Sequence, residues 1–543
     1  MGKRFFRICL PDWVQILLLL GFCFLLYFIN LGRWDLWNPD EPRYAQVARE
    51  MIQGGDWILM HFNGAVYPDK PPLFFWLIAL SSFLWKGFTS FSVRFPSALF
   101  GTLTVVSTFF IGRRLYGSRI GFLSGLILAT SIIFAFLSAR ANIDTTLAFF
   151  TTSALFCFVH WYKNMKEGKP CFSIYGFYVG MALGTLAKGP VGLLIPLLVG
   201  LVYLVYEKDR QAIRRMRLLT GMLLFAAIVL AWYFPAVMRG GKSYLQMTLL
   251  QHTINRYATG WSHAQPFYLY FVSVPSDFFP WSLFLPGAVA YGYSKEMTEK
   301  RKEFLFLLIW CLVIFVFFSL SKGKRGLYLL PLYPAAALLV GKLWNDFIDG
   351  AMIHFNPGWI SFPLRILTGV VLVAGIAVPV GISLKLPSYV TYSIPVALVL
   401  LGVGLAIFML ARQKEWGAIL MILVGITAAG FFYTCRVVFP LVNPHKSARF
   451  ISEEAASRIQ PGENLGLYGL TPGAYVFYTG IVPVAELEKA EELALFLQSP
   501  ERVYCFVNSK DFSAMRKEKR MPKFELITES QVGRNKVLLI SNR

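Results

Sequence analysis

The stretch VQILLLLGFCFLLYFINL, residues 14–31, decides the fold class of this chain. Its apolar run is longer than the core of a signal peptide and lacks a small-residue cleavage site, so we expect a retained membrane helix. The whole chain is similarly apolar, with 56% hydrophobic and 15% charged residues among 543 and a mean hydropathy of +0.55. A soluble domain does not bury that much apolar surface. The composition therefore predicts an α-helical polytopic membrane protein.

Hydropathy predicts about thirteen transmembrane helices. After the first, they start near Ser92, Ile120, Asp144, Cys171, Gly189, Leu218, Ser276, Phe304, Tyr328, Ser361, Thr391 and Gly417. Segment 71–85 is also apolar, but we interpret it as a re-entrant or interfacial helix on the outer side. Only then do six basic segments face the cytoplasm, as the positive-inside rule favours. They are residues 3–7, 113–119, 163–169, 208–217, 295–302 and 412–414.

This topology puts the N-terminus in the cytoplasm and the unusual polar residues on the outer face. We expect a transmembrane domain, 1–435, whose outer loop 32–91 carries interfacial helices, and an outer α/β domain, 436–543. In the second domain, apolar and aromatic runs predict strands at 466–469, 474–480, 502–508 and 536–542, and helices at 485–498 and 510–519. It has no metal-spacing or nucleophile motif, so we expect a cap or an acceptor-docking module.

The net charge of +22 indicates anionic partners. Nucleic acid is not expected, because the positive charge lies in short loops between helices rather than on one exposed domain. Anionic membrane lipids at the cytoplasmic surface account for much of the charge. The outer lysines and arginines oppose the orientation bias, which favours an anionic substrate.

The motif DEPRYA, residues 40–45, directly follows the first span and combines Asp40, Glu41 and Arg43. The residues after it have helical periodicity, with Tyr44, Val47, Ala48 and Met51 on one face, which predicts an interfacial helix. Two carboxylates and an arginine at a membrane surface suggest chemistry on a charged lipid. The alternative is that Asp40 caps the helix and Glu41 complements its dipole.

A second motif, YPDKPPL at residues 67–73, contains Tyr67, Asp69 and Lys70 at the expected start of the interfacial helix. A helix start directs backbone donors and a positive dipole end at an anion, so Lys70 is well placed to bind a phosphate. Alternatively, the lysine only extends to water.

Further ionisable residues lie at other outer turns. Arg140 and Asp144 are four residues apart, a spacing that also allows a simple intrahelical ion pair, and Lys188 could be an ordinary loop lysine. His252 and Arg256 share one helical face. With Asp69, His252 could hold a divalent metal, zinc or a similar ion, in an open site. The stretch 322–328 adds Lys322, Lys324, Arg325 and Tyr328.

Taken in order, DEPRYA, PDKPPL (68–73), RANIDTT (140–146), LAKGP (186–190) and KGKRGLYLLPLYP (322–334) resemble the motifs of lipid-dependent membrane glycosyltransferases. The aminoarabinose lipid A transferases typify that family, and the protein O-mannosyltransferases are more distant members. The resemblance covers residues 30 to 340 or so.

The resemblance implies a GT-C-type fold in the bacterial inner membrane with a periplasmic C-terminal domain and a cavity on the periplasmic face. The donor would be a polyprenyl phosphate-linked sugar, 4-amino-4-deoxy-L-arabinose on undecaprenyl phosphate, and the acceptor lipid A or another lipid or glycan. We expect a monomer. The implied catalytic residues are Asp40 and Asp144, and we add Glu41 to them. The implied donor-phosphate residues are Arg43, Lys70, Arg256, Tyr67 and Tyr328, and we add Lys188. The implied metal ligands are Asp69 and His252. The aminoarabinose transferases carry glutamate at the position of Asp69.

Other functions stay open. A transferase similar to the protein O-mannosyltransferases would share these motifs. A lipid-sugar flippase would also be polytopic, but it would show an ionisable path near the bilayer centre and paired hydropathy repeats. A non-catalytic assembly or sensor protein would have no need for acidic and basic residues on several separate loops. The gathering of charged motifs on one face favours the transferase.

Overall fold

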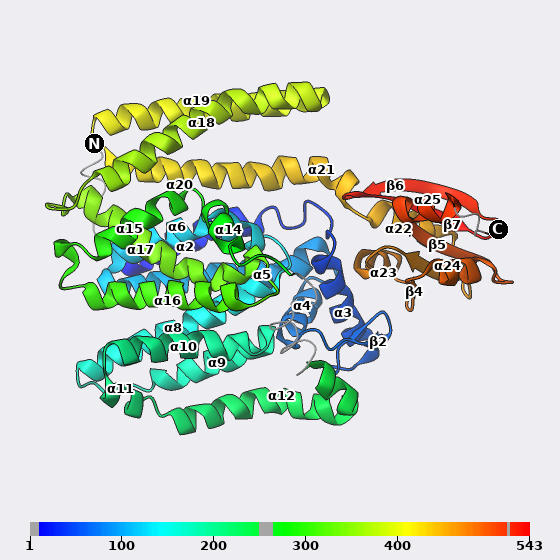
Figure 1. The fold of residues 1–543 in the computed structure, drawn as a ribbon, viewed down its shortest axis with the longest axis horizontal. Coiled ribbons are helices and arrows are strands. Elements are labelled where there is room, and N and C mark those ends of the chain that lie inside the picture. Colours follow the sequence, from blue (N-terminus) through cyan, green and yellow to red (C-terminus); the bar gives the residue numbers. More distant parts are fainter. Residues whose placement is uncertain (1–9, 249–263, 518–521) are drawn as a thin grey trace.

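The computed structural model describes residues 10–248, 264–517 and 522–543. The apolar helices form one bundle, and a small α/β unit extends from one end of it (Figure 1). Helices α3 (Asp40–Gly54) and α4 (Leu73–Leu84), blue in Figure 1, lie between the bundle and the α/β unit. The first two motifs of the sequence therefore lie where these two parts of the molecule meet.

Within the described ranges, eight helical segments are long and apolar enough to cross a membrane. They are α5 (Ser90–Tyr116), α8 (Ile143–Lys166), α12 (Leu218–Gln246), α16 (Arg301–Leu320), η5 (Gly326–Leu332) with α17 (Tyr333–Asp349), α18 (Gly358–Lys385), η6 (Pro387–Tyr389) with α19 (Val390–Arg412), and α20 (Trp416–Tyr433) with η7 (Thr434–Val438) and α21 (Phe439–Lys446). The pair α6 (Ser118–Ala129) and α7 (Ile132–Ser138), bent by 73°, makes a ninth if it is one broken span. The chain is therefore an integral membrane protein.

The expected number of about thirteen spans is not confirmed. The apolar helices α2 (Asp12–Cys23) with η1 (Phe24–Phe28) and α10 (Val191–Tyr206) are shorter than a full span, as is α9 (Ser173–Lys188). The span expected near Ser276 is divided into α14 (Leu269–Asp277), η3 (Trp281–Phe284) and α15 (Leu285–Gly292). Pro280 lies at the break between α14 and η3, and proline lacks the backbone donor that a continuous helix needs.

Helix α4 corresponds to the apolar segment that we expected to be interfacial. Its 12 residues extend over about 18 Å, well short of the ~30 Å hydrocarbon core. It packs against α3 and α5 rather than continuing as a span. The length of α4 thus supports an interfacial position.

Ion pairs gather the predicted cytoplasmic segments at one end of the bundle. Lys163 pairs with Glu303 at 3.0 Å, and Lys302 pairs with Glu207 at 2.7 Å. At the start of α2, Asp12 pairs with Arg113 at 2.6 Å. The short elements α11 (Arg210–Arg215) and η4 (Lys295–Met297) lie at this end, opposite the α/β unit (Figure 1). These segments thus lie together at one end of the bundle, and the side of the membrane that this end faces stays a prediction.

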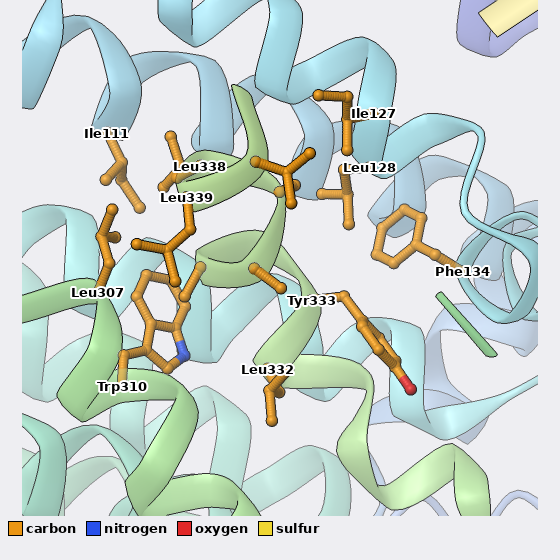
Figure 2. Close-up of a cluster of buried hydrophobic side chains, with 14 of the residues drawn as sticks. Ile111, Ile127, Leu128, Phe134, Leu307, Trp310, Leu332, Tyr333, Leu338 and Leu339 are labelled. Carbon is orange, nitrogen blue, oxygen red and sulfur yellow. The ribbon is translucent and has the colours of Figure 1, made fainter. Parts of the chain in front are cut away.

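The core of the bundle surrounds α17, which is buried along most of its length. Figure 2 shows Leu338 and Leu339 of this helix among side chains from α5, α6, α7 and α16. The indole of Trp310 in α16 donates a hydrogen bond to the Pro331 carbonyl oxygen at 2.9 Å. This bond satisfies a backbone group at the 3-10 turn η5, which leads from the outer end into α17.

The C-terminal α/β unit, residues 449–543, has a five-stranded sheet with strand order β4-β3-β5-β7-β6. Strands β3, β4 and β5 are parallel to one another, whereas β7 runs antiparallel to β5 and β6. The strands are β3 (Asn464–Tyr468), β4 (Ala485–Leu487), β5 (Val503–Asn508), β6 (Glu525–Val532) and β7 (Asn535–Ser541), and the helices are α22 (Arg449–Arg458), α23 (Gly473–Thr479), α24 (Ala490–Leu497) and α25 (Ser509–Lys517).

Two predictions for this unit were wrong. The strand predicted at 474–480 is wrong: residues 474–479 belong to helix α23, because Pro472 and Gly473 start a helix and both of its faces are buried. Residues 485–487 are strand β4 rather than the start of a helix. The division of the chain near residue 435 stays a prediction; α20, η7 and α21 continue past that residue to Lys446.

Helix α3 is fixed to the bundle by a buried ion pair. Its apolar face, Tyr44, Val47, Ala48 and Met51, is buried as its periodicity predicts. Arg94 of α5 is fully buried and contacts Glu41 through Nε at 2.7 Å and through a terminal nitrogen at 3.0 Å. The same guanidinium donates to the carbonyl oxygens of Leu31, Trp34 and Asp35. All five donors of this arginine therefore have partners.

We predict that residues 169 and 510 lie on opposite sides of the membrane, because they belong to opposite ends of the bundle. Both lysines are exposed. A membrane-impermeant thiol reagent applied to intact spheroplasts should label Lys510→Cys but not Lys169→Cys, and permeabilisation should expose both. Labelling of both from outside would contradict the topology and the site that depends on it.

We predict that Glu41→Gln destabilises the fold by about 3 to 5 kcal/mol, because it leaves a buried arginine without its counter-ion. Burial alone raises the pKa of Glu41, but the charges of Arg94 and Arg140 hold it at about 2. The stabilisation is therefore complete above the ordinary pKa of 4.5 and is lost as the pH falls through about 2.

The control is Glu453→Gln, which removes an exposed pair with Arg449 and should cost under about 1 kcal/mol. Thermal unfolding in detergent at neutral pH compares the two variants. Equal midpoints would mean that the buried pair does not hold α3.

Candidate active site

A cavity of about 730 Å³ lies beside the outer loop and reaches into the bundle. Most of its lining is apolar and comes from α10, α12 and α16: Leu193, Leu194, Phe225, Val229, Trp232, Phe317 and Phe318. Its polar lining includes four of the residues singled out in the sequence: Asp69, Lys70, Lys188 and Tyr328. The shape suits a ligand with a long apolar part and an anionic end.

Asp40 lies between two arginines from distant parts of the chain. Its Oδ1 accepts a hydrogen bond from Arg43 at 2.6 Å, and its Oδ2 accepts one from Arg325 at 3.2 Å. The side chain makes no capping bond to the backbone of α3. The capping alternative therefore does not describe Asp40, whose carboxylate holds two cations instead.

The two arginines connect three carboxylates. Burial alone lowers the pKa of Arg43, but neighbouring tyrosines and the carboxylates of Asp40 and Asp69 raise it overall. Burial likewise lowers the pKa of Arg325, and the carboxylates of Asp40 and Asp144 contribute to its net rise. The three acidic residues thus belong to one electrostatic cluster in which the arginines stay charged.

Tyr67, Asp69 and Lys70 form a local network at the start of α4. Lys70 Nζ donates to Asp69 Oδ1 at 3.0 Å, and the Tyr67 hydroxyl donates to Asp69 Oδ2 at 3.1 Å. Burial and the Asp69 charge raise the pKa of Tyr67, which keeps its hydroxyl a donor. The Lys70 side chain is only 11% exposed, so it does not extend to water as the alternative proposed.

Asp144 and Lys188 pair with each other across two helices. Lys188, at the end of α9, donates to Asp144 Oδ1 at the start of α8. The ammonium of Lys188 also lies 4.2 Å from the ring centroid of Tyr328. Lys188 is therefore part of the cluster rather than an ordinary loop lysine, and the alternative of an Arg140–Asp144 ion pair is not what the structure contains.

Glu41 and Arg140 lie behind this cluster. The Glu41 carboxylate accepts hydrogen bonds from Arg94, from the Trp37 and Ala141 amides, and from Arg140 at 3.2 Å. It is 1% exposed and has no open position for a substrate. This geometry disagrees with the prediction of a catalytic Glu41 and fits a residue that positions α3.

The described residues do not fit a metal centre. No group of three or more histidine, cysteine, aspartate or glutamate side chains among them could hold a metal ion. The Asp69 carboxylate is already bonded to the Lys70 ammonium, which would repel a divalent cation. His252 and Arg256 lie outside the described residues, so a metal on Asp69 and His252 and a phosphate contact of Arg256 stay predictions.

Two residues that build the cluster had no assigned role in the sequence. Arg325 binds Asp40, and its signal was a run of cations on the outer side, against the orientation bias. Arg94 binds Glu41, and its signal was a lone arginine inside an apolar span, which must have a buried partner. The sequence shows that such residues need partners but not which partners they have.

Comparison with known proteins agrees with this architecture. The family model described as dolichyl-phosphate-mannose-protein mannosyltransferase matches residues 69–234. An undecaprenyl phosphate-alpha-4-amino-4-deoxy-L-arabinose arabinosyl transferase 2 of Pseudomonas fluorescens is 31% identical over 381 residues, 68% of this chain and 66% of that protein. The enzyme of the same name from Proteus mirabilis is 31% identical over 61% of this chain and 60% of its own length. The matched segment thus spans slightly less than two thirds of these relatives.

Similarity at the level of structure extends further. The crystal structure of ArnT from Cupriavidus metallidurans bound to undecaprenyl phosphate has a TM-score of 0.78 at 21% identity and covers 98% of both chains. An archaeal oligosaccharyltransferase, AglB from Archaeoglobus fulgidus, has a TM-score of 0.59 at 12% identity over 93% of this chain and 70% of its own. Together, these similarities show that the chain has the fold of ArnT and that its matched segment is related in sequence to the arabinosyl transferases.

Proposed function

We propose that this protein transfers 4-amino-4-deoxy-L-arabinose from undecaprenyl phosphate to lipid A or a related lipid at the periplasmic face of the bacterial inner membrane. The observation that carries the proposal is the cavity, whose long apolar wall ends at two lysines. The names of the relatives from Proteus and Pseudomonas supply the sugar and the lipid carrier.

The apolar part of the cavity suits the polyprenyl chain, and its polar end suits the phosphate. Lys70 and Lys188 both line the cavity, and each is already held by a carboxylate. The Nε of Arg43 is buried and has no hydrogen-bond partner among the described residues, so it is a donor that a phosphate oxygen could satisfy. Charge-assisted bonds of this kind are the strong ones in a site of low dielectric constant.

The chemistry follows from these charges. The acceptor oxygen forms a bond to the sugar C1 while the bond from C1 to the phosphate oxygen breaks, and the electron pair leaves with polyprenyl phosphate. Negative charge therefore develops on the phosphate, where fixed lysine and arginine groups stabilise it. The positive charge that develops on the sugar ring is stabilised by nearby carboxylates such as Asp40 and Asp144.

The role of Asp40 depends on the acceptor. A lipid phosphate is already an anion, so Asp40 would only orient groups and stabilise charge. A hydroxyl acceptor has a proton to lose, and a carboxylate would then accept it as general base. Asp40 is 13% exposed and bound by two arginines, so both of its oxygens already accept hydrogen bonds from cations.

The outer location explains why the donor is a lipid. Nucleotide sugars and ATP are absent beyond the cytoplasmic membrane, so the sugar must arrive already activated by its lipid phosphate. The N-terminus would then be cytoplasmic and the C-terminal α/β unit periplasmic, an orientation that the gathering of basic segments at the opposite end supports.

A second candidate function is transfer of a sugar to a protein. The match of residues 69–234 to a protein mannosyltransferase model favours it. The two functions share the donor chemistry and differ in the acceptor.

The experiment that tests the proposal is transfer in liposomes that contain the purified protein. The donor is undecaprenyl phosphate-linked aminoarabinose, and the acceptors are lipid A, phosphatidylglycerol and an unfolded secreted protein in separate vesicles. We expect aminoarabinose on lipid A alone. Modification of the protein acceptor only would favour the second candidate, and donor movement across the bilayer without transfer would indicate a flippase.

We predict that Asp40→Asn lowers turnover by about 100-fold or more, because it removes the charge that holds both arginines. The control Asp56→Asn is in the same outer loop and can keep the capping bonds to the Ile58 and Leu59 amides, so it should transfer normally. Thermal unfolding establishes that both variants are folded. Parental turnover by Asp40→Asn would mean that its carboxylate has no part in the reaction.

We predict that Lys70→Ala raises the KM for the donor at least about tenfold, because a phosphate in this cavity depends on charge-assisted bonds. Lys70→Arg should recover only part of the loss, since a planar guanidinium does not occupy the place of a compact ammonium. The matched control is Lys446→Ala, an exposed lysine of α21. An unchanged KM for the donor in Lys70→Ala would mean that the donor phosphate does not bind at this end of the cavity.

A further inference from the structure

The C-terminal α/β unit does not merely cover the outer loop; it is bonded to the helix that carries Asp40. Helix α23 packs directly against α3. Phe477 and Tyr478 of α23 pack in the same hydrophobic cluster as Tyr44, Val47 and Met51 of α3. The two parts thus share one packed interior, so a movement of α23 would be passed to α3.

Gly473, at the start of α23, lies close to the start of α3. A Cβ atom at this position would lie 3.1 Å from the Arg43 Cβ and 3.3 Å from both the Arg43 amide nitrogen and the Pro39 carbonyl oxygen. These neighbours are on either side of Asp40. Any side chain at Gly473 must therefore push against the segment 39–43, in which two of the predicted site residues lie.

Hydrogen bonds hold the same interface on both sides of that contact. The Tyr478 hydroxyl donates to the Leu36 carbonyl oxygen at 3.1 Å and accepts from the Leu36 amide at 2.7 Å. Arg49 of α3 donates to the Phe477 carbonyl oxygen at 2.8 Å, and its guanidinium lies 4.1 Å from the Phe477 ring centroid. The segment before α3 and the middle of α3 are thus each bound to α23.

A third contact uses the turn between β1 (His61–Phe62) and β2 (Ala65–Val66). The side-chain amide of Asn63 donates to the Val484 carbonyl oxygen at 2.8 Å and accepts from the Val484 backbone nitrogen at 2.7 Å. The backbone amides of Asn63 and Gly64 donate to the Glu50 carboxylate of α3. Contacts therefore fix α3 to the α/β unit along most of its length.

We propose that the C-terminal α/β unit is a clamp that sets the position of α3, with Gly473 and Tyr478 as positioning residues for Asp40 and Arg43. This inference rests on the proposed function, because it concerns the reaction of that same site. Rates of well-oriented reactions fall by about 100-fold for displacements of about 1 Å, so a small shift of α3 is enough to matter. The α/β unit is then part of the catalytic machinery through its contacts, without touching the substrate.

The test compares full-length Gly473→Ala and Gly473→Val with Gly54→Ala, which adds the same methyl group to the far end of α3, where nothing lies within 4 Å. Transfer in liposomes gives kcat at saturating donor, and thermal unfolding gives the folded fraction. We expect Gly473→Val to lose at least about tenfold in kcat per folded molecule, Gly473→Ala to lose less, and Gly54→Ala to match the parent. A folded Gly473→Val with parental kcat would overturn the clamp.

If Gly473→Val does not fold, Tyr478→Phe decides the question. It removes only the hydroxyl that holds Leu36, and its control is Tyr504→Phe, whose hydroxyl contacts Arg458 within the α/β unit itself. Hydrogen exchange of the α3 amides should be faster in Tyr478→Phe than in Tyr504→Phe, and kcat should be lower. Equal exchange and equal kcat in these two variants would overturn the clamp.

Hydrogen exchange also separates the two proposals. Sugar transfer by the parent with no effect of either positioning variant would contradict only the clamp. A parent that transfers no sugar would contradict the proposed function, while the exchange of the α3 amides would still decide whether the α/β unit holds the helix.

Discussion

The buried ion pair between Glu41 and Arg94 is the interaction on which the outer site depends. Removing two charges from water costs several kcal/mol per ion, and the cost is recovered only where every donor and acceptor finds a partner. Arg94 meets that condition with five donated hydrogen bonds, three of them to backbone carbonyls of the loop before α3. The pair therefore fixes the loop, the start of α3 and the span α5 relative to one another.

Asp40 directly precedes Glu41, so this pair also determines where the Asp40 carboxylate lies. From there the charges alternate outward: Asp40 with Arg43 and Arg325, Asp69 with Lys70, and Asp144 with Lys188. Each cation is held by a carboxylate, so the phosphate of the proposed donor would meet positive charges that are already in place. Preorganised charge of this kind is the largest single contribution that many enzymes make to catalysis.

Local patterns in the sequence predicted local structure well. The buried face of α3 followed from its helical periodicity, and helix α4 is too short for a full span, as the prediction of an interfacial helix requires. The strand predicted at residues 474–480 was wrong. Aromatic and β-branched residues favour strands, but here a helix start and burial on both faces outweigh that preference. The single span predicted near Ser276 was wrong, because hydropathy does not detect the break at Pro280.

The site was predictable only in part, because some of its contacts join residues that are far apart in the sequence. The spacing of Asp40 and Arg43 is local and visible in the sequence, whereas Arg325 reaches Asp40 across 285 residues. Glu41 was predicted to be catalytic like its neighbour Asp40, yet the structure buries it against Arg94. Contacts of this range depend on how the spans pack, which no single motif contains.

The central claim is that this protein places an amino sugar on an outer-leaflet lipid. Mass spectrometry of lipid A from cells with and without the chain tests it most directly. The account predicts that lipid A gains the mass of aminoarabinose only in cells that contain the chain, and that Asp40→Asn abolishes the gain. Unmodified lipid A in cells that contain both the folded protein and its lipid-linked donor would contradict the account.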